Sequence, residues 1–155
     1  LQNPESRKWI HFTDTVMGGI SSGKLAYQID DNEKYYRLTG DVNTENNGGF
    51  IQFATEIKKV DNNNFTGIRL RVRGNGESYQ LHLRTRMTKL PWQYYSQEFI
   101  TTEDWNVVEL PFSKFKKSNF YQPKSFKPNA IRSIGIVAIG KDFQAEIDLA
   151  HIEFF

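Results

Sequence analysis

Arginine is the residue whose spacing in this chain is best suited to binding chemistry. Polar and apolar residues alternate through 67–73 and 78–84, so the polar side chains of each segment share one side if it is a strand. A guanidinium group binds a carboxylate or a phosphate through two parallel hydrogen bonds. If the two segments pair as a hairpin, one side of it carries Arg69, Arg71, Arg73, Gln80, His82, Arg84 and Arg86.

Two interpretations of this arginine face are open. Guanidinium groups on adjacent strands repel one another unless anions lie between them, and Glu56 and Glu98 are candidate partners that would make it a salt-bridged outer surface. Alternatively, the face binds a carboxylate, a phosphate or an acidic protein surface. Nearby aromatic residues would then form a platform for a sugar ring or for a partner's side chains: Trp92, Tyr94 and Tyr121.

Two loops with paired glycines form a second candidate site. Glycine pairs before strands often serve the backbone alone, through positive φ, a bulge or close packing. The functional alternative is a pair of loops that shape a binding edge at one end of a sandwich. The residues of that edge would be Asp14, Met17, Gly18, Gly19, Ser21, Ser22, Asn47, Gly48 and Gly49.

Catalytic and metal chemistry find little support. The three histidines (His11, His82 and His151) fall in three different predicted strands, and no catalytic or cofactor motif is present. The absence of cysteine excludes disulfides, thiolate catalysis and Cys-ligated metal sites. Four carboxylates could approach one another in the manner of a structural calcium site, namely Asp14, Glu45, Asp148 and Glu153. We nevertheless predict no catalytic residue, no metal and no cofactor.

Charge and composition exclude further classes. The net charge of +2 is too small to indicate a nucleic-acid partner, and no apolar run is long enough to span a membrane. The lysine-rich stretch 114–127 contains interleaved aromatics, a pattern found in proteins that bind single-stranded nucleic acid. The simpler interpretation, which we adopt, is a solvated crossover loop whose aromatics pack onto the domain. Aromatic residues make up 14% of the chain, enough to fill a core and to exclude wholesale disorder.

Short alternating segments must position all of these residues. In the clearest pair, the apolar residues of 67–73 and 78–84 fall on one side when Arg73 pairs with Ser78, across a turn that contains Gly74 and Gly76. The sequence therefore predicts a direct β-hairpin here. Further strands are predicted at 8–12, 24–30, 35–42, 49–57, 94–101, 106–112, 133–139 and 144–155.

About ten short strands without helical periodicity predict an all-β fold. Their spacing is typical of an antiparallel β-sandwich or jelly roll, and residues 1–155 are expected to form a single domain, since no linker or repeat is present. The proline- and lysine-rich connection 113–129 is expected to contain no strand and to cross one end of the sandwich. Because the chain begins at Leu1, we expect a processed or trimmed product, and the sequence does not indicate a compartment.

Six stretches go beyond a generic sandwich. DTVMGGISSG (14–23), ENNGGF (45–50) and LRVRGNG (70–76) are followed by LRT (83–85), WNVVELPFSKF (105–115) and SIGI (133–136). In this order they resemble the CIA30 family, named after complex I intermediate-associated protein 30. The resemblance runs from about Trp9 to the C-terminus, and the single-domain form is more similar to bacterial members.

This resemblance implies a jelly roll of the galactose-binding-domain-like type. For the eukaryotic members it also implies a role as an assembly factor or chaperone of respiratory complex I. We therefore expect a non-enzymatic domain that holds an unfolded or partly assembled protein through its loop edge and arginine face. The alternative is a carbohydrate-binding module, which the fold superfamily and the aromatic residues favour. An open groove lined by aromatics would indicate sugar, and a flat patch of mixed arginine and apolar residues would indicate protein.

Overall fold

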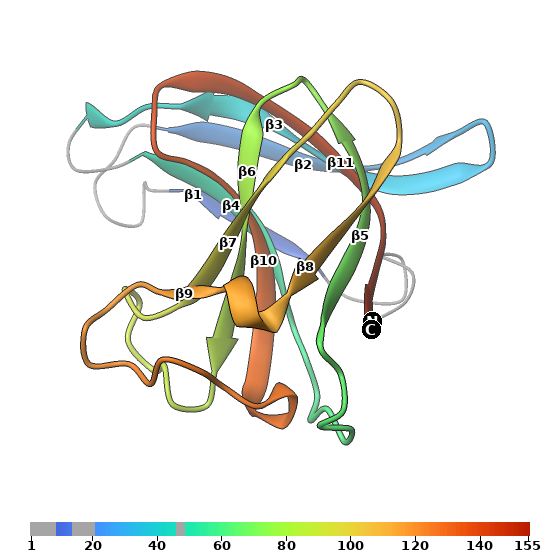
Figure 1. Ribbon diagram of the computed structural model, residues 1–155. Coiled ribbons are helices and arrows are strands. Elements are labelled where there is room, and N and C mark those ends of the chain that lie inside the picture. Colours follow the sequence, from blue (N-terminus) through green and yellow to red (C-terminus); the bar gives the residue numbers. More distant parts are fainter. Residues whose placement is uncertain (1–8, 14–20, 46–48) are drawn as a thin grey trace.

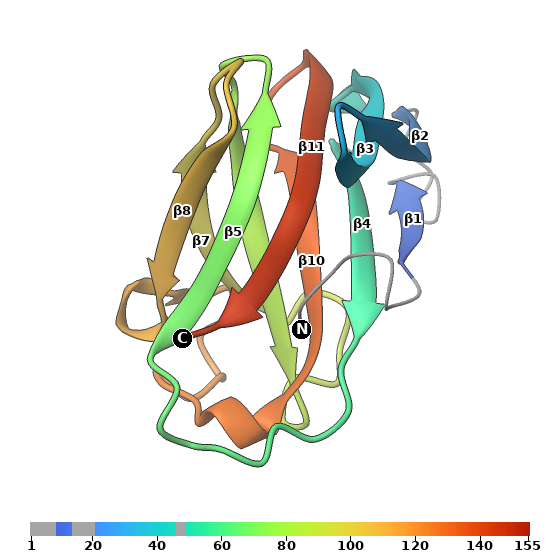
Figure 2. The same ribbon diagram turned by 90° about the vertical axis from the view of Figure 1, so that its right-hand side faces the viewer.

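Two antiparallel β-sheets packed face to face form the protein (Figures 1 and 2). The computed structural model describes residues 9–13, 21–45 and 49–155. Sheet A has the order β1 (Ile10–Thr13), β4 (Phe50–Glu56), β10 (Ile131–Ile139), β6 (Ser78–Thr85), β7 (Tyr95–Ile100) and β9 (Lys116–Lys117). Sheet B has the order β2 (Ser22–Asp30), β3 (Glu33–Val42), β11 (Phe143–Phe154), β5 (Gly67–Gly74) and β8 (Asn106–Pro111).

The predicted fold class is confirmed. Each of the ten predicted strand segments overlaps a strand of the structure, and all strand pairs are antiparallel. The alternation of apolar residues succeeds because each strand buries only one side, while the other side faces out of the sandwich.

The predicted hairpin between 67–73 and 78–84 is wrong. β5 pairs with β11 and β8 in sheet B, whereas β6 pairs with β10 and β7 in sheet A. The connection 75–77, in which Gly76 has a φ of +83°, therefore leads from one sheet to the other. Two amphipathic strands can bury their apolar sides next to each other in one sheet or facing each other across two. Their alternation is the same in both cases, so it does not reveal the pairing.

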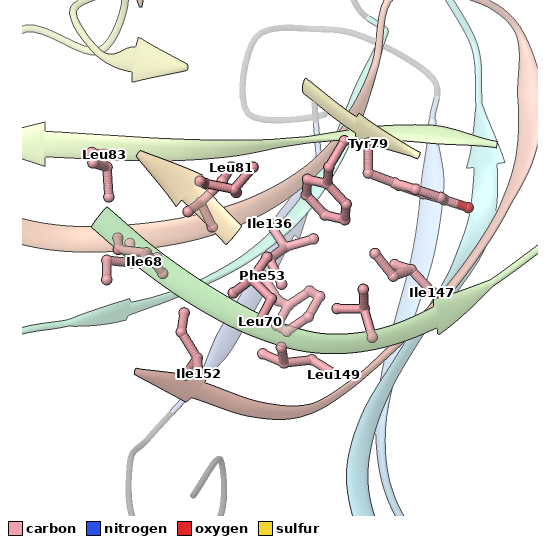
Figure 3. Close-up of a cluster of buried hydrophobic side chains, with 14 of the residues drawn as sticks. Phe53, Ile68, Leu70, Tyr79, Leu81, Leu83, Ile136, Ile147, Leu149 and Ile152 are labelled. Carbon is pink, nitrogen blue, oxygen red and sulfur yellow. The ribbon is translucent and has the colours of Figure 1, made fainter. Parts of the chain in front are cut away.

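The core lies between the sheets and joins these two strands face to face. Ile68 and Leu70 of β5 and Leu81 of β6 are fully buried, and their side chains meet in the interior (Figure 3). Burial of each such side chain contributes roughly 1.5–3 kcal/mol. The strands predicted to be hairpin neighbours are thus held together by core packing instead of a hydrogen-bonded ladder.

Tyr79 adds a polar link between the sheets. Its hydroxyl lies 2.7 Å from Asn75 Oδ1 and 3.0 Å from the carbonyl oxygen of Glu146, and it accepts a hydrogen bond from the Glu146 amide at 2.9 Å. Burial raises the pKa of Tyr79 to about 12, so its hydroxyl stays protonated. The first residues of β6 are therefore fastened to β11 of the opposite sheet.

The connection from β8 to β10 crosses one end of the sandwich, as predicted (Figure 2). It contains the short 3-10 helices η4 (Phe112–Lys114) and η5 (Pro128–Ala130), and Phe115 and Phe126 pack onto the core. The prediction that it contains no strand is wrong, because Lys116 and Lys117 form β9 at the edge of sheet A. A two-residue edge strand tolerates lysine because both side chains are exposed, and Lys117 Nζ donates to the carbonyl of Phe120 at 3.2 Å.

Candidate functional site

The outer face of sheet B carries one half of the predicted arginine face, and its charges are neutralised internally. Arg69 pairs with Glu153 at 2.9 Å and with Glu109 at 3.4 Å, and Arg71 pairs with Glu33 at 2.5 Å. These carboxylates come from β11, β8 and β3, which lie beside β5 or two strands from it in the sheet. The hydrogen bond from Arg69 and a second from His151 lower the pKa of Glu153.

Asp148 is the centre of this network. Its side chain on β11 is only 3% exposed and accepts hydrogen bonds from Arg37 Nε at 2.8 Å, Arg37 Nη2 at 2.9 Å and Arg73 Nε at 2.7 Å. The hydrogen bond to Asp148 raises the pKa of Arg37. The Arg73 guanidinium also lies 4.9 Å from the Tyr35 ring and 4.6 Å from the Trp105 ring. Arginine and carboxylate are thus tied into a layer with two aromatic rings.

A cleft of about 360 Å³ opens beside this layer, lined by Arg37, Arg73, Gly74, Asn75, Glu103, Glu146 and Asp148. Both arginines of the cleft already bind Asp148. The arrangement is the salt-bridged outer surface that is the first of the two interpretations of the arginine face. It differs in its partners, because neither Glu56 nor Glu98 contributes: both lie on strands of sheet A.

The expectation that all the arginines share one face is wrong. Arg84 is on β6 and Arg86 directly follows it, so both belong to sheet A, whereas Arg71 and Arg73 belong to sheet B. The physical reason is the crossing between the sheets at 75–77, which turns the outer sides of β5 and β6 in opposite directions.

The outer side of β6 carries a stacked pair of rings. His82 and Tyr94 lie with ring centroids 4.0 Å apart and an interplanar angle of 10°, and His82 Nε2 is 2.8 Å from Gln80 Oε1. His82 is only 5% exposed although it points away from the core. Burial, assisted by the charge of Arg84, lowers the pKa of His82 from 6.5 to about 3, so the imidazole is neutral near pH 7.

The arginines next to this pair bind backbone carbonyls instead of carboxylates. Arg84 Nη1 donates to the Gln93 carbonyl at 3.0 Å, and Arg132 donates to the carbonyls of Thr85 at 2.9 Å and Thr88 at 2.8 Å. Arg86 donates to the carbonyl of Asn129. No carboxylate among the described residues forms an ion pair with any of the three arginines.

The sequence around these arginines is strongly basic. Segments 84–94 and 112–132 together contain nine Lys and Arg residues and no Asp or Glu, although the whole chain has a net charge of only +2. Both segments lie at the same end of the sandwich, beside β6, β7 and β9 (Figures 1 and 2). We call this surface, made of 84–94 and 112–132, the basic end.

Exposed apolar side chains gather on the two loops of the basic end. Trp92 is 57% exposed, Phe120 84% and Tyr121 86%, and Met87 and Leu90 are exposed as well. The loops are fastened to each other through Ser118, whose Oγ donates to the Trp92 carbonyl at 2.5 Å and accepts from the Tyr94 amide at 2.9 Å. The structure thus brings the predicted Trp92, Tyr94, Arg84 and Arg86 together on one surface.

The predicted loop edge is only partly described. Asp14, Met17, Gly18, Gly19, Asn47 and Gly48 lie outside the described residues. Gly49 has the expected positive φ, +125°, and a Cβ there would lie 3.1 Å from Thr44 Cγ2. The hydroxyl of buried Ser21 bonds the backbone of Asn43, and Ser22 lines a cleft of about 380 Å³. The Ser21–Asn43 hydrogen bonds link the residue before β2 to the residue after β3.

Calcium ligands are not gathered in the part of the chain that the structure describes. No group of three or more acidic or histidine residues there could hold a metal ion, and Asp148 and Glu153 are bound by arginines. Sequence reasoning missed Arg37, Arg132, Tyr35 and Trp105, whose roles depend on strand neighbours distant in sequence. It also missed the concentration of positive charge, which a local count of charged residues reveals.

Known proteins resemble the chain in sequence or in fold. Residues 1–149 match the family described as Complex I intermediate-associated protein 30 (CIA30), while no curated protein matches. The fold is similar to the family 11 carbohydrate-binding module of a cellulosomal cellulase of Clostridium thermocellum, with a TM-score of 0.80, 13% identity and coverage of 100% of this chain and 92% of the module.

Two further solved structures share this architecture. A family 11 module from the same organism, in complex with a beta-1,3-1,4-mixed-linked tetrasaccharide, gives a TM-score of 0.75 at 13% identity, covering 95% of this chain and 88% of the module. A family 30 carbohydrate-binding module gives 0.61 at 13% identity, covering 88% and 92%. No helix of the described residues has the length and apolar character needed to cross a membrane. Because the sequence match spans nearly the whole length, the chain belongs to the CIA30 family.

Proposed function

We propose that this chain is a non-catalytic binding domain that holds a protein partner at its basic end. The observation that carries the proposal is the group of exposed Met87, Leu90, Trp92, Phe120 and Tyr121 on two mutually hydrogen-bonded loops, surrounded by cations and without an acidic residue. Phe120 and Tyr121 lie against each other with ring centroids 5.6 Å apart, and large exposed apolar side chains that adjoin one another are uncommon unless they bind something. The mixture of aromatic, methionine and arginine side chains is typical of protein interfaces.

Membership of the CIA30 family supports a stoichiometric role. The domain would bind an incompletely assembled subunit and release it when that subunit's own partner arrives. No chemistry is required for this, only a surface that covers apolar groups of the partner. Of the predicted loop edge, the residues outside the described part remain a prediction and are not needed for this proposal.

The test is co-purification from the native source with surface variants. Trp92→Ala and Tyr121→Ala remove exposed rings, and Val107→Ala on β8, itself 58% exposed, is the matched control on the opposite sheet. We expect the first two variants to lose a specific co-purifying protein that wild type and the control retain, with unfolding midpoints unchanged. Equal recovery with all four proteins would contradict the proposal.

Carbohydrate binding is a second candidate function, which the Tyr94–His82 stack favours. A partly exposed ring beside the polar groups of Gln80 and Arg84 on an outer sheet face is suited to stack against a sugar ring. The similarity to carbohydrate-binding modules supports this candidate through the fold alone. Affinity electrophoresis against a polysaccharide panel tests it: retardation by one polysaccharide that Tyr94→Ala abolishes would favour it, and no retardation by any would reject it.

A further inference from the structure

Arg84 uses only one of its three guanidinium nitrogens. Nη1 donates to the carbonyls of Gln93, at 3.0 Å, and Leu90, at 3.4 Å. Within 9–13, 21–45 and 49–155, neither Nε nor Nη2 has a hydrogen-bond acceptor. Neither atom is fully buried, because the fully buried side-chain N and O atoms without a partner in those residues are Trp9 Nε1 and Gln97 Oε1 alone. The Nε–Nη2 edge of Arg84 is therefore held in place by the contacts of Nη1 and has no acceptor among the described residues.

The same chain shows what such an edge binds. Arg37 uses Nε and Nη2 together to grip the two carboxylate oxygens of Asp148, at 2.8 Å and 2.9 Å. This side-on pair of parallel hydrogen bonds is the strong, directional mode of arginine–carboxylate recognition. Arg84 presents the equivalent edge, with its remaining nitrogen already fixed by the loop 86–94.

The electrostatic surroundings favour an anion at this edge. Arg84 is partly buried and close to Arg132, and these two effects lower the pKa of Arg84. Arg132 is itself held by the carbonyls of Thr85 and Thr88, and segments 84–94 and 112–132 contain no acidic residue. A carboxylate bound here would offset an unfavourable concentration of positive charge.

The apolar residues beside Arg84 restrict the chemical class of carboxylate that could bind there. Leu90, whose carbonyl binds Arg84, is exposed, and Met87 and Trp92 extend the apolar surface along the same loop. Aliphatic and thioether groups beside an arginine suit a carboxylate flanked by apolar side chains, as in a protein segment, better than a sugar acid surrounded by hydroxyls.

We propose that Arg84 is the receptor for an acidic side chain of the bound partner, and that the partner segment places apolar residues beside that carboxylate. This inference rests on the proposed function, since it names the chemistry of the partner at the basic end. Arg71 and Arg73 have no such role, because their guanidinium groups are engaged by Glu33 and Asp148.

The experiment measures binding of two labelled peptides by fluorescence anisotropy. In the probe peptide two glutamates flank a phenylalanine and a leucine, and in its matched peptide glutamine replaces both glutamates. We expect the glutamate peptide to bind about tenfold more tightly than its match at low salt, with most of the difference lost at high salt. Arg84→Gln should abolish the difference, and Arg84→Lys should keep part of it, because lysine retains charge without the two-donor edge. Arg71→Gln, on the other sheet, should leave the difference unchanged.

Equal affinity of the two peptides, or no binding of the glutamate peptide at millimolar concentration, would overturn the inference. So would binding of an oligogalacturonate but of neither peptide, which would assign the edge to a sugar acid. Failure of the proposed function is distinguishable, because it would appear as co-purification that does not depend on Trp92 or Tyr121. Co-purification that depends on these rings but is unaffected by Arg84→Gln would contradict only the carboxylate assignment.

Discussion

The β5 arginines of sheet B and the arginines of the basic end are similar in sequence and opposite in environment. Arg69, Arg71 and Arg73 each face a carboxylate from another strand of their sheet, and Asp148 at the centre is almost wholly buried. Among the described residues, Arg84 and Arg132 bind backbone carbonyls and no carboxylate. The difference shows that the strand neighbours, and not the arginines themselves, decide whether such a face is closed by ion pairs or open to a ligand.

The two regions also differ in what surrounds the charges. In sheet B the rings of Tyr35 and Trp105 lie under guanidinium groups and are part of the layer. At the basic end Trp92, Phe120 and Tyr121 extend into solvent. The first arrangement stabilises the fold, and the second leaves apolar surface available for a partner.

Asp148→Asn should give the largest effect. It removes the buried carboxylate that Arg37 and Arg73 share, leaving two partly buried cations without their anion. We expect a loss of about 2–4 kcal/mol in the free energy of unfolding, less than for a fully buried pair because both arginines are partly exposed. Urea denaturation measures it. As a control, Glu33→Gln breaks a more exposed pair and should cost under about 1 kcal/mol. An unchanged midpoint for Asp148→Asn would mean that the network does not stabilise sheet B.

Acidification should destabilise the protein through His82 on β6 before it does so through Glu153 on β11. The pKa of His82 is 6.5 in the unfolded chain and about 3 in the native one, so only the unfolded chain gains a proton as the pH falls through this interval. The free energy of unfolding should therefore drop by about 2 kcal/mol between pH 6.5 and pH 5. Denaturant curves at several pH values measure this, and His82→Gln should flatten the dependence. The pKa values of Glu153 and Asp142 are lowered in the native protein, so protonation of these two groups reduces the free energy of unfolding only at more acidic pH. A wild-type curve that is flat above pH 5 would contradict a buried neutral His82.

Arg84→Gln should have a small effect on stability and a large one on binding. The variant loses the charge-assisted hydrogen bonds to Gln93 and Leu90 but also relieves the repulsion from Arg132. We expect a change within about 1 kcal/mol in the free energy of unfolding. Thermal and urea midpoints check this. A loss of several kcal/mol in the free energy of unfolding would show that Arg84 has a structural role, as the β5 arginines have.

Arg71→Ala should have the smallest effect. Both side chains of its pair with Glu33 are about one third exposed, so we expect less than about 1 kcal/mol in stability and no change in partner recovery. Unfolding and co-purification measured on the same preparations check both expectations. Loss of the partner with this variant would show that the binding surface includes sheet B, and would contradict the distinction between the β5 arginines and those of the basic end.

The strands could be predicted from sequence because alternation reports one buried side of each strand. Their pairing could not, as β5 and β6 demonstrate. Whether two amphipathic strands lie side by side or face to face depends on partners such as β11 and β10, which lie dozens of residues further along the chain. Nothing in the alternation of 67–73 or 78–84 encodes those contacts.

The candidate site was predictable to the extent that its chemistry is local. Arginine alternation correctly identified outward-facing cations, and Trp92 and Tyr94 were recognised as surface aromatics. The ion-pair partners could not be predicted, because Glu33 and Asp148 approach β5 only through the sheet order. The positive charge of 84–94 and 112–132 was present in the sequence, but the two segments become one surface only when the connection crosses the end of the sandwich.

Amide hydrogen exchange of the complex recovered from the native source, compared with the free protein, tests the central claim most directly. We predict that protection on binding is concentrated in 86–94 and 118–127, and that the strands β3, β5 and β11 beneath the sheet B arginine network exchange at the same rate in both states. Protection confined to sheet B, with the two loops of the basic end unchanged, would contradict the assignment of the partner-binding surface.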